Sequence, residues 1–241
     1  MLFNVLIWIG LAFQPYDNTW TYNAFNPAKQ FQLFTEYKSN SQEDWASKNL
    51  QTGDIICVRG NQYIMRYFNF SNYICSITRS EYSHCAFIVK MGRSTYVIDM
   101  DGSGTRRMPF SLFMRELNHK KIKVVRVKEQ YSQSILEASN FCWTRYFAGV
   151  QFDFNFINGG DTYYCAELIC RAFHKSKLCL MQPVKVSDLP GIYDNPVENI
   201  LVIYGSRLFV DKPFDFDKKL YTTQGIIESK KVFCVFEGEV K

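Results

Sequence analysis

The segment TYYCAELICRAF, residues 162–173, places a cysteine at the start of a predicted helix. Four apolar residues recur at the spacing of one buried helical face: Leu168, Ile169, Ala172 and Phe173. Asp161 or Thr162 is suited to cap this helix, because short polar side chains accept hydrogen bonds from the first free amides. The pattern therefore predicts that Cys165 lies in the first turn.

A thiol at this position is suited to catalysis. The unpaired amides and the dipole of a helix N-terminus favour negative charge, which lowers the pKa of a cysteine toward the range of a working nucleophile. The alternative is that Cys165 is a small apolar residue packed at the helix start, since free cysteine is among the most buried residue types. The thiol alone does not decide between the two.

The composition describes a chain that can bury a sizeable core. It has 241 residues, of which 47% are hydrophobic and 17% aromatic, and this length fits one domain with extensions. The net charge of +5 is small, and the densest basic run, HKKIKVVRVK at residues 119–128, alternates basic and apolar residues. That alternation indicates a strand with one solvated face, so no nucleic-acid partner is expected.

The chain has eight cysteines, with no CxxC pair and no regular spacing. Because the chain is much longer than disulfide-dense scaffolds, we expect most of them to be free thiols. Cys170 and His174 lie four residues apart on one helical face, but two ligands without a second pair do not predict a zinc site. No metal and no organic cofactor is expected.

The first 13 residues, MLFNVLIWIGLAF, are strongly apolar. They match a signal peptide incompletely, because a positive n-region and a clear cleavage site are missing, and a buried first strand or helix is the alternative. A helix of this length is too short to span a bilayer. The localisation stays open between cytoplasm and export, and this segment is what supports any association with a membrane.

Patterns along the rest of the chain predict an α+β fold. Strands are expected at residues 50–60, 83–90, 95–102 and 121–128, and helices at 131–147 and at Cys165. Strands grouped before helices are typical of this class. We expect an N-terminal extension at 1–44, a catalytic core at 45–180 and a C-terminal extension at 181–241. The extension carries two strand candidates that would pack on the core, ILVIYG at 200–205 and KVFCVFEGEV at 231–240.

A cysteine nucleophile needs an imidazole within hydrogen-bond reach and usually a third group that orients the imidazole. Three histidines are available. His119 lies in a charged turn, and His174 lies far along the same helix as Cys165. His84 instead lies on a predicted strand, SHCAFIVK, on the same face as Ala86 and Ile88.

The hairpin that contains His84 offers two carboxylates as the third group. If residues 91–94 close the hairpin, positions that sum to 185 face each other, so His84 lies opposite Asp101 and diagonal to Asp99. A loop longer or shorter by one residue would move both carboxylates to the other face. In the alternative interpretation, His84 is a satisfied core residue and the aspartates form a turn.

Five segments, in this order, resemble the circularly permuted members of the NlpC-type, papain-like amidases, in particular the YiiX-like hydrolases. They are TGDIICVRG, YSHCAFIV, YVIDMDGSGTRRMPFSLF, GVQFDFNF and YYCAELIC, within residues 45–180. Ordinary papain-like enzymes place the cysteine before the histidine, whereas here His84 precedes Cys165. The resemblance implies an antiparallel half-barrel sheet packed on the helix that bears the nucleophile.

The resemblance also implies roles for individual residues. Cys165 is the nucleophile and His84 the base, and Asp99 stands where the YiiX-like pattern commonly has a glutamate; since Asp is one methylene shorter, Asp101 or a water is the alternative. Tyr164 matches an aromatic position, either as a hydrogen-bond donor to developing charge or as a packed ring. Asp153 matches the aspartate after the aromatic, for loop fixation or substrate contact.

These observations predict a cysteine hydrolase that cleaves an amide bond through a thioester intermediate. One alternative is a lipid-directed thiol acyltransferase or esterase of the same fold, and the other is a non-catalytic binding module. The substrate, a peptide, a cell-wall fragment or a lipid, stays open. Arg106 and Arg107 are candidates to contact an anionic group on it.

Overall fold

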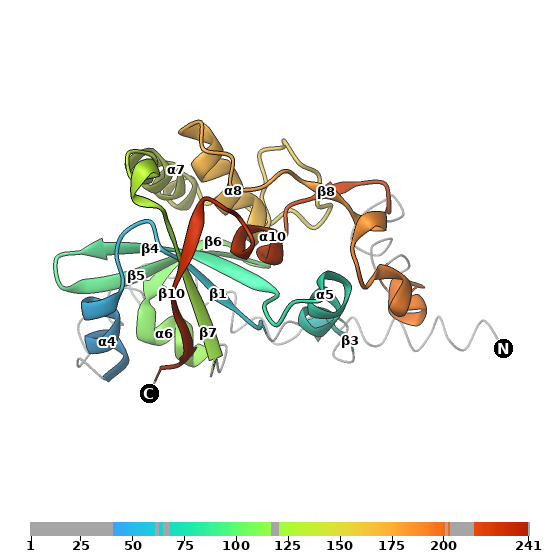
Figure 1. Cartoon of the computed structure of the whole chain (residues 1–241), viewed down its shortest axis with the longest axis horizontal. Coiled ribbons are helices and arrows are strands. Elements are labelled where there is room, and N and C mark those ends of the chain that lie inside the picture. The colour runs from blue at the N-terminus through green and yellow to red at the C-terminus, as the bar shows by residue number, and fades with distance from the viewer. Residues whose placement is uncertain are drawn as a thin grey trace.

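The computed structural model describes residues 41–60, 63–64, 68–116, 121–200, 202 and 215–240 (Figure 1). The apolar segment 1–13 lies outside these residues, as does most of the predicted extension at 1–44. Among the helices described, none has the length and apolar character needed to cross a membrane.

A six-stranded antiparallel sheet forms the centre of the molecule, in the order β10-β7-β1-β4-β5-β6. Its strands are β1 (Ile55–Val58), β4 (His84–Met91), β5 (Ser94–Asp101), β6 (Gly104–Pro109), β7 (Lys121–Val127) and β10 (Val232–Glu239). The four strands predicted before residue 130 are therefore confirmed. The candidate at 231–240 is also a strand, and it pairs with β7 at one edge of the sheet.

The helices are α4 (Ser41–Asn49), α5 (Phe70–Thr78), α6 (Phe110–Glu116), α7 (Ser134–Phe147), α8 (Cys165–Lys175) and α10 (Thr223–Ile227). Short elements complete the description: β2 (Tyr63–Ile64), β3 (Phe68–Asn69), β8 (Val184–Lys185), β9 (Lys219–Leu220) and 3-10 turns at 129–131, 186–188 and 192–194. The strand predicted at 200–205 is wrong where it is described, because residues 196–200 and 202 are helical. A short apolar run fits either element, since periodicity does not separate a buried strand from a buried helix.

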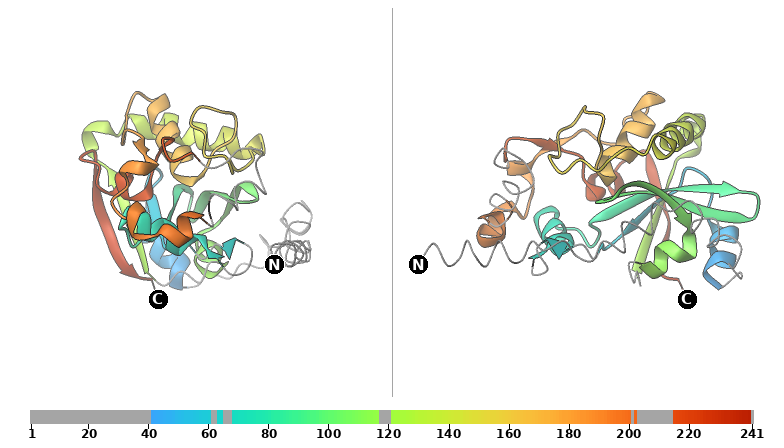
Figure 2. Two further views of the ribbon diagram at one scale, coloured as in Figure 1. Left: turned by 90° about the vertical axis from the view of Figure 1, so that its right-hand side faces the viewer. Right: turned by 180° about the vertical axis from the view of Figure 1, so that it is seen from behind.

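Helices cover both faces of the sheet (Figures 1 and 2). α7 and α8 pack on one face and α4 and α6 on the other, so the two hydrophobic clusters lie on opposite sides. β4 contributes to both because successive side chains of a strand point to opposite faces: Phe87 packs toward α8, and Ile88 packs toward α6. The ring of Phe87 lies 6.0 Å from that of Phe173 on α8, and burial of each is worth about 1.5–3 kcal/mol.

The register predicted for the hairpin of β4 and β5 is confirmed. Met91 pairs with Ser94 and Phe87 with Ile98. Gly92 adopts a positive φ of 62° in the tight turn, a conformation that glycine reaches at little cost. The side chains of His84 and Asp99 are therefore brought to the same face of the sheet, as expected.

Candidate active site

Cys165 is the first residue of α8, at the predicted helix start. The helical face predicted from the sequence is buried as expected: Leu168, Ile169, Ala172 and Phe173 are each at most 1% exposed. The predicted caps, Asp161 and Thr162, are wrong. The N-cap is Tyr164, in an extended conformation (φ −102°, ψ 171°), and no side chain of the described residues caps the helix. The first amides of α8 are thus left without a side-chain acceptor.

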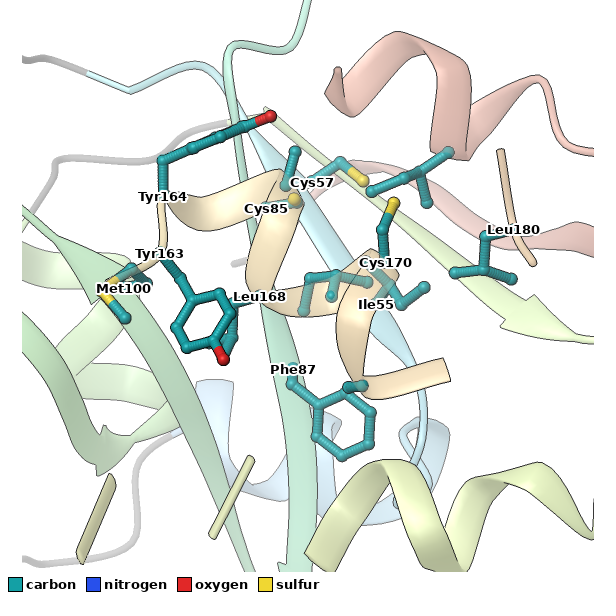
Figure 3. Packing of buried hydrophobic residues seen from close by; sticks show 14 of the residues in the cluster. Ile55, Cys57, Cys85, Phe87, Met100, Tyr163, Tyr164, Leu168, Cys170 and Leu180 are labelled. Carbon is teal, nitrogen blue, oxygen red and sulfur yellow. The ribbon is translucent and has the colours of Figure 1, made fainter. Parts of the chain in front are cut away.

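The two tyrosines before Cys165 anchor the start of the helix from different sides (Figure 3). The Tyr163 ring points along α8 into the core, whereas Tyr164 points away from the helix axis. The Tyr164 hydroxyl donates to Asn158 Oδ1 (3.1 Å) and accepts from the Tyr221 amide (2.7 Å). Its proton is thus engaged by a loop, and its ring lines the pocket beside Cys165.

His84 begins β4 and lines the same pocket as Cys165. His84 Nε2 lies 2.6 Å from Asp99 Oδ1, and the two side chains are 5% and 0% exposed. Since Nε2 faces the carboxylate, Nδ1 is the nitrogen left for the thiol. Burial by itself would lower the pKa of His84, but the charges of Asp99 and Cys165 hold it well above its ordinary value.

The pKa of the Cys165 thiol is shifted in the opposite direction from that of His84. The strongest influence on Cys165 is a hydrogen bond from the Cys85 thiol, which lowers the pKa; burial raises it, and His84 lowers it further. The resulting pKa of Cys165 is well below that of a free cysteine. A lowered thiol pKa beside a raised imidazole pKa favours the thiolate–imidazolium pair, which is the reactive form of a cysteine nucleophile.

Asp99 is held on its other side by an arginine. Arg106, directly opposite on β6, contacts Asp99 Oδ2 at 2.8 Å and Asp101 Oδ2 at 3.0 Å. Burial opposes ionisation of Asp99, but His84 and Arg106 together hold its pKa below the usual range. Asp101 is paired with Arg106 and accepts from Ser103, and no described contact joins it to His84. The structure thus brings Asp99, rather than Asp101, to the imidazole.

A pocket opens onto Cys165 and His84, with about 620 Å³ of empty space that includes open solvent. Its walls come from segments far apart in the sequence and are mainly apolar: Phe70, Ile74, Phe152, Phe156, Leu189 and Leu220. Hydroxyl groups, among them Ser71, Ser83 and Thr222, supply the polar part of the lining. The thiol therefore opens into a largely apolar space.

Residues 49–199 match the family of permuted papain-like amidase enzymes of the YaeF/YiiX type, the C92 peptidases. The chain belongs to this family. The match spans most of the chain, including β1, β4 to β7, α7 and α8, so the predicted resemblance is confirmed. At the level of its family the protein is a papain-like cysteine hydrolase whose substrates contain amide bonds.

A solved structure supports the same fold. The crystal structure of the metalloprotein yiiX from Escherichia coli O157:H7 superposes with a TM-score of 0.66, at 19% sequence identity, over 79% of this chain and 99% of that one. The permuted papain-like fold predicted here is thus confirmed. Among curated proteins, a sequence comparison finds no match.

Because that solved protein is named a metalloprotein, we looked for metal ligands among the side chains of this chain. Within the described part of the chain, no three His, Cys, Asp or Glu side chains are grouped to hold an ion. Cys170 is buried in the core, whereas His174 is exposed on the last turn of α8. The described residues thus do not fit a metal centre.

Asp153, the remaining candidate, lies in a loop of this C92-type fold. It is 3% exposed, and its carboxylate accepts from the amides of Asn155 (2.8 Å) and Ile157 (2.6 Å). These bonds fix a turn in which Phe156 takes a positive φ of 51°. Asp153 therefore shapes the loop that carries Phe156 to the pocket wall, which is the loop-fixation alternative.

Arg107 and Cys85 complete the surroundings of the site. Arg107 stacks over Tyr96, Trp143 and Tyr146, with its guanidinium 5.0–5.5 Å from their ring centres, and Arg106 is engaged by carboxylates. Both arginines, which were candidates to bind a substrate anion, thus have partners within the protein. The influence of Cys85 on the pKa of the nucleophile was not predicted, because strand alternation places Cys85 on the face opposite His84.

Proposed function

We propose that this chain is a cysteine hydrolase that cleaves an amide or ester bond next to an apolar acyl group. Cys165 is the nucleophile, His84 the general base and acid, and Asp99 the group that orients the imidazole. The observation that carries the proposal is the buried contact of Asp99 with His84 beside Cys165, at a pocket whose walls are mainly apolar.

The reaction proceeds in two halves. The Cys165 thiolate attacks the carbonyl carbon, and the oxyanion that forms faces the uncapped amides at the start of α8. The His84 imidazolium then gives its Nδ1 proton to the leaving nitrogen or oxygen, and the acyl group stays on Cys165 as a thioester.

Water resolves the thioester. His84, now neutral, takes a proton from the water as the hydroxide equivalent attacks the carbonyl, and the acid product and the Cys165 thiolate are released. Asp99 stays ionised throughout, because Arg106 balances its charge at 2.8 Å. Its task is to fix which imidazole nitrogen carries the proton.

The apolar pocket supports an acyl chain over a polar cell-wall peptide. Apolar side chains line the pocket beside the thiol and would contact the substrate: Phe70 and Ile74 on α5, Phe152 and Phe156 in the loop before α8, and Leu220. Burying each methylene of an acyl chain is worth about 0.8 kcal/mol. Turnover should therefore rise steeply with chain length until the pocket is filled.

The test is hydrolysis of a series of acyl p-nitrophenyl esters and matched acyl amides of increasing length, beside a cell-wall dipeptide amide. Cys165→Ala and His84→Ala are expected to abolish turnover. Cys179→Ala is the matched control, since Cys179 is a free thiol of similar partial exposure and is not among the residues lining the pocket.

The outcomes separate this proposal from its rivals. Retained turnover in Cys165→Ala refutes the assignment of the nucleophile. Preference for the dipeptide refutes the acyl substrate while keeping the mechanism. Products joined to an added amine or alcohol identify an acyltransferase, which the same pocket would suit. Saturable ligand binding with no turnover by the wild type identifies a binding module.

A further inference from the structure

One wall of the pocket comes from the C-terminal part of the chain, far from Cys165 in the sequence. Residues 220–223, from β9 to the start of α10, line the pocket together with the thiol. We refer to residues 218–223 as the C-terminal wall. On one side this wall is bonded to residues 184–186, since β9 pairs with β8 and the Val186 amide donates to the Lys218 carbonyl (2.9 Å). These bonds do not involve the helix that carries the nucleophile.

Asn158 and Tyr164 bond the C-terminal wall to the start of α8. The Asn158 side chain accepts from the Tyr164 hydroxyl through Oδ1 (3.1 Å) and donates through Nδ2 to the Lys219 carbonyl. The Tyr164 hydroxyl, at the end of a ring that points away from α8 (Figure 3), accepts from the Tyr221 amide at 2.7 Å. Since Tyr164 directly precedes Cys165, three hydrogen bonds link the wall to the residue beside the nucleophile.

We propose that Asn158 is a specificity-determining residue, which holds the C-terminal wall in place and so limits the width of the acyl group that reaches Cys165. The pocket lies between this wall, α5 and the loop at 152–156. A wall bonded on both sides does not move aside for a wide substrate, so straight acyl chains are favoured over branched or cyclic ones. This inference rests on the proposed hydrolase and names its substrate class. Asn158 itself is not among the residues that line the pocket, so it acts as a positioning residue through the wall.

The loop that carries Asn158 is fixed independently of the wall. The amide of Gly159 donates to Glu167 Oε1 (3.2 Å), and Glu167 is a fully buried residue of α8. On the other side of Asn158, the buried carboxylate of Asp153 accepts from the amides of residues 155 and 157. The Asn158 amide therefore holds the wall from a fixed base, and its removal leaves the loop with its own hydrogen bonds.

The position of Asn158 calls for a side chain that both donates and accepts. The Lys219 carbonyl can only accept, and the Tyr164 hydroxyl donates its single proton to Asn158. Asn158→Ala removes both bonds, whereas Asn158→Asp, ionised at neutral pH, keeps the acceptor for Tyr164 and loses the donor to Lys219. Loss of one such hydrogen bond changes an equilibrium by roughly 2- to 12-fold, so either substitution should loosen the wall.

The test measures the shape of the pocket through the rates at which two alkyl iodoacetamides label Cys165 in the full chain. N-hexyl and N-cyclohexyl iodoacetamide carry the same number of carbons, one as a straight chain and the other as a wide ring. The ratio of their rates at Cys165, read by peptide mass, is divided by the same ratio for free cysteine. We expect the wild type to favour the hexyl reagent. Asn158→Ala and Asn158→Asp should each lower the ratio by about fivefold.

Hydrogen exchange, measured by mass on peptides that span residues 218–223, reports on the wall itself. Its exchange should be faster in both Asn158 variants, while peptides from α7 keep the wild-type exchange. Asn49→Ala is the matched control, since Asn49 Nδ2 also donates to a backbone carbonyl, that of Trp45 (2.8 Å), but in α4 on the opposite face of the sheet. This variant should retain both the wild-type labelling ratio and the wild-type exchange of the wall.

Three outcomes would overturn the proposal: unchanged exchange of the wall in folded Asn158→Ala, faster exchange with an unchanged labelling ratio, or equal rates for the two reagents in the wild type. The wild-type ratio decides the last even if a variant fails to fold. Neither readout needs turnover. A wild type that favours the hexyl reagent but hydrolyses no ester or amide would refute the proposed hydrolase and leave the role of Asn158 in place.

Discussion

Replacing Asp99 with asparagine should break the thiolate–imidazolium pair while leaving every side chain near its place. Asp99 is fully buried and lies 2.6 Å from His84 Nε2, so solvent does not screen its charge. An opposite charge in contact changes an ionisation equilibrium by roughly 10- to 1,000-fold. Arg106 neutralises part of the Asp99 charge from 2.8 Å. We therefore expect Asp99→Asn to lower the equilibrium constant for forming the thiolate–imidazolium pair by about 100-fold, near the middle of that range.

The sign follows from the directions of the two pKa values. The reactive pair exists above the lowered pKa of Cys165 and below the raised pKa of His84. Without the carboxylate the pKa of His84 falls, and the weakened imidazolium lets the pKa of Cys165 rise. The pH window of reactivity in Asp99→Asn should therefore narrow from both sides.

The assay is the rate of iodoacetamide alkylation at Cys165 as a function of pH, with thiolate absorbance near 240 nm as a second readout. Asp101→Asn is the matched control, since Asp101 also pairs with Arg106 but makes no described contact with His84. Its profile should follow the wild type. If Asp99→Asn also superposes on the wild type in a folded protein, Asp99 does not support the pair and the reasoning fails.

Three other changes test parts of the structure around the site. Burial raises the pKa of Glu167 to about 7, so the free energy of unfolding falls as pH rises from about 4.5 to 7. In urea unfolding, Glu167→Gln should be more stable than wild type at pH 8, by up to about 3 kcal/mol, and close to wild type at about pH 4. Gly191→Ala places a Cβ 2.1 Å from the Ser76 carbonyl and should cost about 1–3 kcal/mol in the same assay, whereas Gly102→Ala, with 3.8 Å of room, should cost much less. Ile74→Trp fills the pocket and should shorten the longest acyl chain hydrolysed without slowing alkylation of the thiol; an unchanged chain-length profile would place the acyl site elsewhere.

The sequence was enough to predict the hairpin that brings His84 and Asp99 together. A tight turn fixes the register of its two strands, so pairs such as Met91 and Ser94 follow from loop length alone. The start of α8 followed equally from the 3.6-residue repeat of its buried face. Both are local relationships, in which the interacting residues lie close along the chain.

The choice between Asp99 and Asp101 could not be made in that way. Both carboxylates lie on one face of β5, and what separates them is their distance from His84 and the position of Arg106 on a third strand. The caps at Asp161 and Thr162 were wrong because the chain is still extended at Tyr164 and the helix begins later. Cys85 was missed because alternation along a strand says nothing about a helix end that reaches over it.

The position of β10 at the sheet edge bears on how the molecule is made on the ribosome. β7 and the strands that carry His84 and Asp99 emerge before α8, and β10 emerges after it. Until then β7 has β1 on one side and an open row of backbone amides and carbonyls on the other. Between the synthesis of α8 and that of β10, the nascent chain already contains Cys165, but the edge of β7 is still unpaired. The same edge of neighbouring chains on one messenger RNA can pair with it, in competition with β10. Slow translation between α8 and β10 should therefore lower the yield of soluble protein, and chaperones that shield strands should restore it.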